Sequence, residues 1–450
     1  SGFHTNHHRS QTDACNARAA LASRSQNFYA HGHTSALKSA AQGFHTLIAA
    51  QFFSALADNA LLILAMALLM EQGHDPFWIP LLKLMFTLSY VLLGPWVGAW
   101  ADAWPKHRVM MWANGIKVLA CLSMSLGLHP LLAFSLAGLG AAIYAPAKYG
   151  LITEIEPTER LVHANGWIEV STVCAALFGV VLGGYLVSAH WLSFSSSWGL
   201  LPGCLIRSQY LGSLMSLLLL YGLAAMLNHF IPNSGKVYQP HDWHWLSVCK
   251  QFKHDQQILW EDPLAAISLS VTTLFWGVGA IMQLLVLAWA QTNLNLSLEH
   301  AAYLQGTSAL GVIAGAAWAA RSVGITQWFK VLRVGLVLGL LLPLMAIVDQ
   351  VGWALLLALA LGASGGYFVV PMNAILQHRG VQLLSAGRSI SVQNTNENAS
   401  ILIMMGIYSS LVHAHLEVNT LAVSLGALVM LGMGLVHWRF QQLKRSGLLG

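Results

Sequence analysis

Long apolar blocks alternate with short polar segments over most of the chain, while the first 44 residues are polar and show no periodicity. A hydrocarbon core of about 30 Å requires about 20 apolar residues in a helix, because each residue adds 1.5 Å along the axis. A helix also satisfies its own backbone hydrogen bonds, for which lipid offers no partner. The pattern therefore predicts an all-α integral membrane protein with twelve transmembrane helices. The predicted spans are 45–70, 77–101, 109–126, 130–150, 162–189, 209–231, 264–291, 300–320, 327–348, 351–377, 386–412 and 418–438.

Positive charges divide the predicted loops into two sets. Of the 22 lysine and arginine residues, three lie within the spans, and only one, Arg207, lies on the loops that connect the spans on one side of the membrane. The others lie at the two termini, on the alternate loops or at span ends beside those loops. By the positive-inside rule, both termini and the central loop are cytoplasmic, which requires an even number of spans. The same distribution accounts for the formal net charge of +5 without a nucleic-acid partner.

Composition excludes the class of soluble enzymes. The chain is 56% hydrophobic and 9% charged, whereas a soluble domain typically carries about 25% charged residues. Its five cysteines are odd in number and scattered, which indicates neither a disulfide framework nor a metal site of the CxxC type. No G-x-x-x-x-G-K-S/T phosphate loop occurs, so ATP hydrolysis by that route is excluded. We therefore expect a transporter without catalytic residues, metal or cofactor.

The polar segment after the sixth span divides the chain into two halves of six spans. A faint internal repeat relates them, because Pro146 near the end of the fourth span corresponds to Pro371 near the end of the tenth, and a charged loop follows each. Such halves around a central loop are typical of secondary carriers, which hold their substrate at mid-membrane between the halves. The predicted units are a polar mobile tail (1–44), an N-terminal six-helix bundle (45–231), a cytoplasmic central loop (232–263), a C-terminal six-helix bundle (264–440) and a cytoplasmic tail (441–450).

Charged residues inside the spans are candidates for function. A charge at the bilayer centre costs about 2.5–3.5 kcal/mol, so it usually faces a cavity or a partner. Asp58, followed by Asn59, lies near the middle of the first span, and we interpret it as a cavity-facing residue for substrate or coupling ion; the alternative is a structural polar pair. Lys148 ends the fourth span, where it can snorkel to the interface, meet a lipid phosphate or pair with Asp58.

Amides and acids also gather on two later spans. Asn165 and Glu169 are four residues apart in the fifth span and share a helix face. Six consecutive polar residues begin at Gln393 in the eleventh span, where Gln393 and Glu397 share a face and Asn394 lies beside them. Interhelical hydrogen bonding is one interpretation of these side chains. We favour a polar wall along a transport pathway.

The loop after the second span carries Asp102, Lys106 and Arg108. It resembles the Gly-x-x-x-Asp…Arg loop of the major facilitator superfamily, in which acidic and basic ends gate the cytoplasmic side. The glycine before the basic pair is absent here, and the two basic residues also satisfy the charge rule by themselves.

Further segments resemble the bacterial lysophospholipid transporters (LplT) of the major facilitator superfamily over about residues 45–440. The segments that carry the resemblance are Ala57-Asp-Asn-Ala-Leu-Leu62, Arg108-Val-Met-Met111, Ala113-Asn-Gly-Ile-Lys117, Pro146-Ala-Lys-Tyr-Gly150, Ala164-Asn-Gly166 with Glu169, Leu274-Phe-Trp-Gly277, Phe368-Val-Val-Pro371 with Asn373-Ala374, and Val392-Gln-Asn394 with Glu397-Asn398.

This resemblance implies the major facilitator fold and a flippase of the bacterial inner membrane. Such proteins bring lysophosphatidylethanolamine and related lysolipids to the cytoplasmic leaflet, where a partner acyltransferase/acyl-carrier-protein synthetase restores the missing chain. Asp58, Lys148 and Glu397 would belong to the polar pathway. One departure is Gln283, where relatives have arginine, so we expect a phosphate contact there to be lost or taken over by Lys148.

The expected mechanism is alternating access to a cavity with polar residues from both halves. We expect Asp58 to meet the head-group ammonium, Lys148 the phosphate, and the polar run from Gln393 the glycerol. The predicted substrate-binding residues are Asp58, Asn59, Lys148, Asn165, Glu169, Gln283, Asn373, Gln393, Asn394 and Glu397, and the predicted gating residues are Asp102, Lys106 and Arg108.

Two rival functions remain open at this point. A proton-coupled antiporter of drugs or other amphiphiles would use Asp58, and the glycine-rich fifth span around Gly179 and Gly183 is similar to that of such antiporters. An integral-membrane acyltransferase would need a His-Asp pair near a membrane surface. The one His-x4-Asp spacing, His8 to Asp13, lies in the polar tail, so we do not favour this function.

Overall fold

The computed structural model describes residues 42–74, 78–196, 209–236 and 243–447. Most of the tail predicted for 1–44 lies outside these residues. Every regular element of the described residues is helical, as the apolar blocks predict. Twelve helical segments coincide with the twelve predicted spans, and two further helices, α7 and α9, lie between spans.

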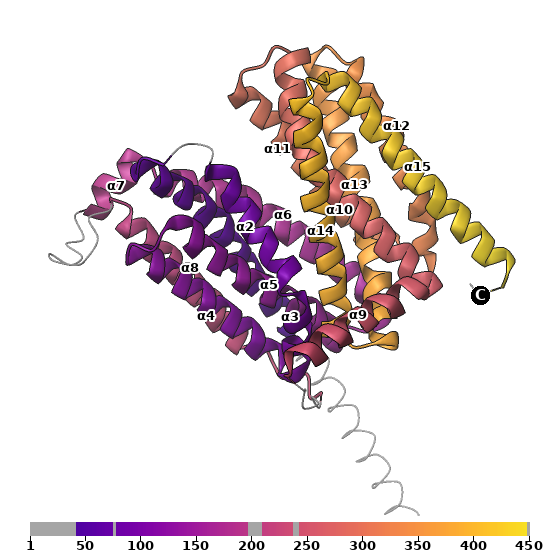
Figure 1. Cartoon of the computed structure of the whole chain (residues 1–450), viewed down its shortest axis with the longest axis horizontal. Helices are drawn as coiled ribbons and strands as arrows, with labels where there is room; N and C mark the ends of the chain where they lie inside the picture. The colour runs from indigo at the N-terminus through magenta and orange to yellow at the C-terminus, as the bar shows by residue number, and fades with distance from the viewer. Residues whose placement is uncertain (1–41, 75–77, 197–208, 237–242, 448–450) are drawn as a thin grey trace, which may run out of the picture.

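The first half of the chain forms one helical bundle (indigo to magenta in Figure 1). Its second span is broken into two helices, α2 and α3, which meet at an angle of 62°. Pro95 follows the break directly and cannot continue the hydrogen-bonding pattern of the preceding turn. The helices are Gln42–Glu71, α2 (Trp78–Leu92), α3 (Gly94–Ala103), α4 (Lys106–Ser125), α5 (Pro130–Ile155), α6 (Leu161–Leu186, preceded by a 3-10 turn, Thr158–Arg160), α7 (Ala189–Ser196) and α8 (Leu211–His229).

The second half forms the other bundle (orange to yellow in Figure 1). Its third span is composite, because α12 has a 3-10 helix at each end, η2 and η3. The helices are α10 (Pro263–Asn293), α11 (Leu298–Ser322), η2 (Ile325–Val331), α12 (Leu332–Leu341), η3 (Leu342–Ala346), α13 (Val351–Leu383), α14 (Ala386–His413) and α15 (Val418–Arg445).

The spans differ in polarity. Eight described helices are long and apolar enough to cross a membrane, or nine when α2 and α3 count as one span. The other three, α4, α11 and α14, fall short of that standard. Two of them show why, since α4 begins with Lys106 and Arg108 and α14 holds the polar run that begins at Gln393. These polar helices bring hydrophilic side chains into the protein interior.

The two bundles meet near α3, α9 and α14 and diverge toward the opposite end (Figure 1). At the junction α14 packs against α2, α3 and α5, while α6 packs against α11 and α13. The helix α9 (Trp245–Glu261) contacts α3 of the first bundle and α10 and α14 of the second. The predicted central loop therefore contains a helix that bridges both bundles.

Glycines allow close contacts between helices within each bundle. A Cβ atom on Gly179 would overlap the backbone of Leu56, and one on Gly183 would crowd Ile63 and Ala60 of the first helix. The two glycines of α6 therefore allow the fifth span to pack closely against the first helix. In the second bundle, a Cβ atom on Gly362 of α13 would overlap the backbone of α11.

Candidate functional site

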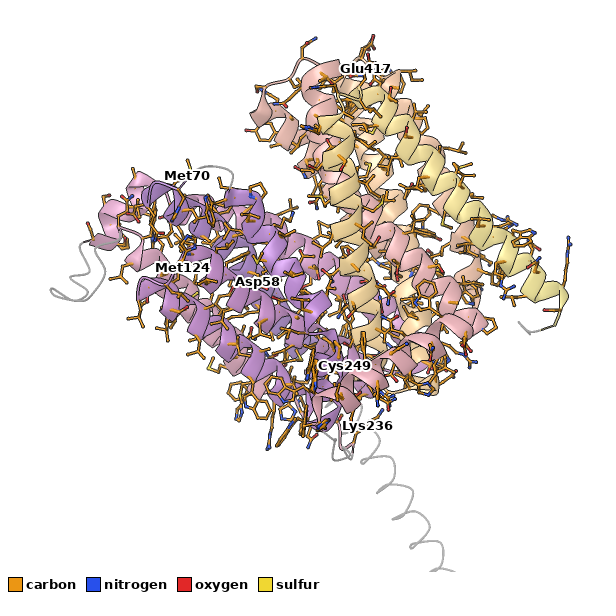
Figure 2. All side chains as sticks on the ribbon, viewed as in Figure 1. Asp58, Met70, Met124, Lys236, Cys249 and Glu417 are labelled. Atoms are coloured by element: carbon orange, nitrogen blue, oxygen red, sulfur yellow. The ribbon has the colours of Figure 1, made fainter. Side chains whose placement is uncertain are left out.

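A cavity of about 250 Å³ lies within the N-terminal bundle. Its walls come from the first helix, α2, α4, α5 and α6. In Figure 2, Asp58 lies between Met70, at one end of the bundle, and Lys236, at the other. Three predicted residues, Asp58, Asn59 and Lys148, line the cavity together. The lining residues all come from one bundle, whereas we expected both to contribute. The polar and aromatic lining residues are Gln51, Ser54, Asp58, Asn59, Lys83, Phe86, Tyr90, Lys117, Phe134, Tyr144, Lys148 and Thr172.

The ion pair between Asp58 and Lys117 is the central feature of the cavity wall. The Lys117 Nζ lies 2.6 Å from Asp58 Oδ2, and the Tyr221 hydroxyl donates to Asp58 Oδ1 at 2.8 Å. Lys117 is 1% exposed and also donates to Ser54 Oγ at 3.0 Å. The carboxylate and the ammonium neutralise each other, which reduces the cost of burying either group. Of the partners considered from sequence, the structure gives Asp58 a lysine, but it is Lys117 and not Lys148.

Lys148 is buried and does not snorkel to the surface. Its Nζ donates to Gln51 Oε1 at 3.2 Å and lies 4.4 Å from the centre of the Tyr149 ring. Gln51 in turn donates to Thr172 Oγ1 at 3.0 Å, which ties the first helix to α6. The ammonium also interacts electrostatically with the carboxylate of Glu169 on α6.

A second polar cluster lies in the C-terminal bundle. Gln393 Nε2 donates to Glu397 Oε1 at 2.7 Å and to Asn373 Oδ1 at 2.9 Å, so three predicted residues from α13 and α14 are joined. Glu397 does not line the cavity, but it lies close enough to Glu169 on α6 for the two carboxylates to repel each other when both are charged. Through Glu169 and Lys148, a band of buried polar groups therefore extends from the cavity into the second bundle.

Other predicted residues join the bundles. Asn165 and Gln377 exchange two amide hydrogen bonds of 2.8 Å, one in each direction, between α6 and α13. Gln283 on α10 accepts a hydrogen bond from Lys83 of α2 at 3.2 Å. Asn394 accepts a hydrogen bond at its backbone carbonyl from Asn398, one turn further along α14. Asn165 thus lies in a contact between bundles, where its amide is fully paired.

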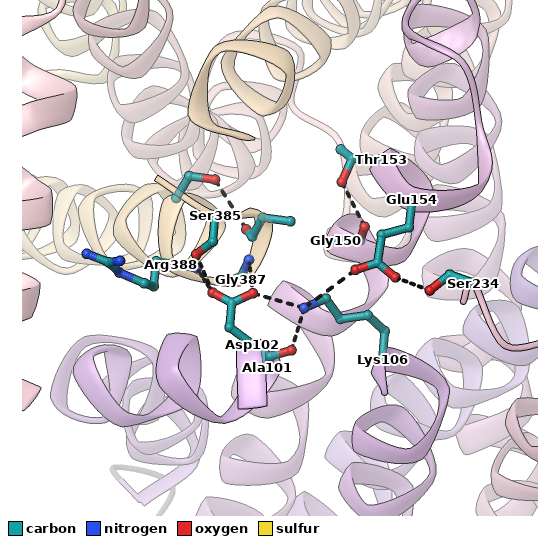
Figure 3. A network of polar contacts seen from close by, with 12 residues as sticks. Ala101, Asp102, Lys106, Gly150, Thr153, Glu154, Ser234, Ser385, Gly387 and Arg388 are labelled. Carbon is teal, nitrogen blue, oxygen red and sulfur yellow. Dashed lines mark hydrogen bonds and ion pairs between the residues drawn. The ribbon is translucent and has the colours of Figure 1, made fainter. Parts of the chain in front are cut away.

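The predicted gating loop forms a polar network at the junction of the bundles (Figure 3). Asp102 accepts hydrogen bonds from Ser385 Oγ at 2.5 Å and from the backbone N–H groups of Gly387 and Arg388, both at 2.9 Å. These donors form the N-terminus of α14, where a negative charge is favourable. Lys106 Nζ lies 2.9 Å from Asp102 Oδ1 and is 2% exposed.

Arg108, the third predicted gating residue, is exposed on the outer side of α4. The network instead includes Glu154 of α5. Its Oε1 lies 3.8 Å from Lys106 Nζ, and its other carboxylate oxygen accepts a hydrogen bond from the Ser234 hydroxyl at 2.6 Å. A parallel contact lies nearby, where Arg388 on α14 forms a two-point ion pair with Asp255 on α9. The network therefore links the loop after the second span, α5, α9 and α14.

Sequence reasoning overlooked several residues of this site. Lys83 and Lys117 are the two intramembrane lysines besides Lys148, and the same cost argument that selected Asp58 applies to them. Tyr221, Glu154 and Ser385 carried no such signal, because their importance depends on which helices pack together.

The lining of the cavity suits the binding of a charged molecule. Among the described residues, no group of three histidine, cysteine, aspartate or glutamate side chains is placed to hold a metal ion. The cavity instead combines three lysines and one carboxylate with aromatic walls. Such a surface fits a charged head group, while the surrounding apolar helices fit an acyl chain.

Comparisons with known proteins agree with this picture. The profile of the Major Facilitator Superfamily matches residues 47–405. The lysophospholipid transporter LplT of Photorhabdus laumondii is 36% identical over 404 residues, which cover 89% of this chain and 97% of the relative. The chain belongs to the LplT family of the major facilitator superfamily. The LplT protein of Escherichia coli O1:K1 is likewise 36% identical over 394 residues, covering 87% of this chain and 94% of the relative.

Solved structures show the same fold at low sequence identity. A bacterial homologue of the iron transporter ferroportin has a TM-score of 0.66 at 17% identity and covers 90% of this chain and 99% of its own. The human organic anion transporter MFSD10 has a TM-score of 0.68 at 14% identity, covering 88% and 99%. The predicted major facilitator fold is thereby confirmed. As the LplT family is a family of transporters, the prediction of a transporter and not an enzyme is confirmed too.

Proposed function

We propose that this protein moves lysophospholipids across the membrane by alternating access. The observation that carries the proposal is the 36% identity to LplT proteins over nearly the whole chain. The cavity supports it, because its charged wall within an apolar bundle suits a zwitterionic or anionic head group. Family membership does not favour the drug antiporter considered as an alternative.

The head group would enter the cavity among Asp58 and the lysines, while the acyl chain stays in contact with lipid or apolar helix faces. Asp58 can receive the head-group ammonium only in competition with Lys117, which already holds one of its oxygens. We therefore assign Asp58 and Lys117 a joint role, in which the pair opens as the substrate binds. The polar band through Lys148, Glu169 and Glu397 would carry the change to the second bundle.

We further propose that the protein resides in a bacterial inner membrane with both termini in the cytoplasm, as the distribution of positive charge supports. The network around Asp102 and Lys106 would then close the cytoplasmic side, and the diverging ends of the bundles would face outward (Figure 1). Rocking of the bundles would break this network and expose the head group to the inside. A separate acyltransferase/acyl-carrier-protein synthetase would consume the delivered lysolipid.

The direct test is uptake of lysophosphatidylethanolamine from the outer leaflet of proteoliposomes, resolved by leaflet with and without ion gradients. Asp58→Asn should reduce transport strongly, because Lys117 would lose its counter-charge. The matched control is Lys330→Gln, because Lys330 is an exposed residue of η2 that lies outside the cavity and donates a hydrogen bond to Gln327 on the same 3-10 helix. A wild-type protein that leaves lysolipid in the outer leaflet would refute the proposal.

A further inference from the structure

The three lysines of the cavity differ in what neutralises them. Lys117 pairs with Asp58 at 2.6 Å, and Lys148 interacts electrostatically with Glu169. Within the described residues neither Lys148 nor Lys83 forms a salt bridge, but Lys148 is buried, whereas Lys83 on α2 is exposed and its Nζ donates to the side-chain carbonyl of Gln283 at 3.2 Å. Lys83 therefore carries the least compensated positive charge on the cavity wall.

We propose that Lys83 receives the phosphate of the lysolipid and thereby sets head-group preference. A phosphate oxygen is a better acceptor for an ammonium than a neutral amide, since charge-assisted hydrogen bonds are roughly twice as strong. The phosphate can therefore replace the amide oxygen of Gln283. Both side chains are exposed, so an incoming head group reaches them without rearrangement of the core. This inference rests on the proposed lysolipid transport.

The exchange has a mechanical consequence, because Lys83 and Gln283 belong to different bundles. Replacing their hydrogen bond with a phosphate contact removes one link between α2 and α10. The hydrogen bond that Gln305 donates to the Gln283 backbone carbonyl lies wholly within the second bundle and remains. Substrate binding at Lys83 thus loosens the contact between bundles at the same moment as it fills the cavity.

The charge of the cavity predicts which head groups benefit most. Three lysines and one aspartate line it, so its wall carries an excess of positive charge. Lysophosphatidylglycerol brings a net negative charge. Lysophosphatidylethanolamine carries an ammonium group near its phosphate, and the Lys83 ammonium repels that ammonium group. The contribution of Lys83 should therefore be larger for lysolipids with a net negative head group.

The test measures transport of both lysolipids by the reconstituted full chain and by four variants, Lys83→Gln, Lys83→Arg, Lys148→Gln and Lys330→Gln. Lys83→Gln should raise the KM for lysophosphatidylglycerol about 10- to 100-fold, as expected for the loss of one hydrogen bond between charged groups. Its KM for lysophosphatidylethanolamine should rise less, and the maximal rate should change little for either. Lys83→Arg should restore most of the preference, and Lys330→Gln should behave as wild type.

The outcomes separate this inference from the proposed function. A wild-type protein that transports neither lysolipid refutes the function itself. If wild type transports both lysolipids and Lys83→Gln leaves both KM values unchanged, Lys83 does not bind the phosphate. If the variant raises both KM values equally, Lys83 does not set head-group preference. If instead Lys148→Gln alone raises the KM for the anionic lysolipid, the phosphate belongs to Lys148 and the proposal is wrong.

Discussion

Replacing Asp102 with asparagine should shift the protein toward the state in which the junction of the bundles is open. Asparagine has nearly the same shape and can still accept one hydrogen bond, but it carries no charge. In the structure the carboxylate accepts two backbone N–H groups of α14 and one hydroxyl, and contacts the Lys106 ammonium. All of these contacts except the one to Lys106 join the two bundles.

The expected size of the shift follows from these contacts. Hydrogen bonds to charged groups contribute about 1.5–3 kcal/mol each, and a charge at a helix N-terminus contributes about 0.3–1 kcal/mol. Asparagine retains part of the hydrogen bonding, so we expect a net loss of about 2–3 kcal/mol. The ratio of open to closed molecules should then rise about 30- to 140-fold, at 1.4 kcal/mol per factor of ten.

The assay is a distance distribution between spin labels at Glu159 and Thr326. These exposed residues lie on the 3-10 turn before α6 and on η2, which contact each other across the bundles. The closed state gives a short distance, and the Asp102→Asn variant should add a longer one. Arg108→Gln, which alters an exposed charge outside the network, is the control. An unchanged distribution in the Asp102 variant would refute the assignment of this network as the closing contact.

Three more predictions test the packing and the charges. Asp58→Asn should lower thermal stability by about 3–5 kcal/mol, because Lys117 stays buried without its counter-charge; adding Lys117→Met should restore stability but not transport. Gly362→Val should destabilise the protein by about 1–3 kcal/mol or more by pushing α13 away from α11, while Gly352→Ala on the same helix, where a Cβ atom meets nothing within 4 Å, should not; melting curves in detergent compare the two. Burial alone would raise the pKa of the Asp262 carboxyl, but hydrogen bonds from an arginine on α13 hold that pKa below its usual value. The stability from this contact is present above the ordinary carboxyl pKa and lost as the pH falls through the lowered one, so Asp262→Asn should flatten the loss of thermal stability in acid, and equal acid slopes would contradict the assignment.

The spans could be predicted from sequence because a membrane imposes a length and a polarity on every helix that crosses it. Even α14 was found despite its six polar residues, since apolar blocks surround them. The depth of Asp58 followed from counting residues, and the cost of burying its charge marked it as important. The local sequence of a single segment is therefore sufficient to predict these features.

The interaction partners of these residues could not be predicted from sequence, because they depend on which helices pack against each other. Lys117 lies 59 residues from Asp58, and nothing in either segment specifies that α4 faces the first helix. The donors to Asp102 lie in the other half of the chain, more than 280 residues away. The apolar pattern over 77–101 predicts one span; Pro95 favours a break there, but the direction of the bend depends on the helices that pack against α2 and α3, among them α5 and α14.

Because of this bend, the two parts of the second span make different contacts with the C-terminal bundle. The α3 segment carries Asp102 near its end and is bonded to the start of α14, whereas α2 carries Lys83, which is hydrogen-bonded to Gln283 on α10. A straight helix would transmit any displacement of one end rigidly to the other. With a break after Leu93, α2 can tilt while the hydrogen bonds between Asp102 and α14 stay in place, so that a movement at Lys83 need not open the junction of the bundles.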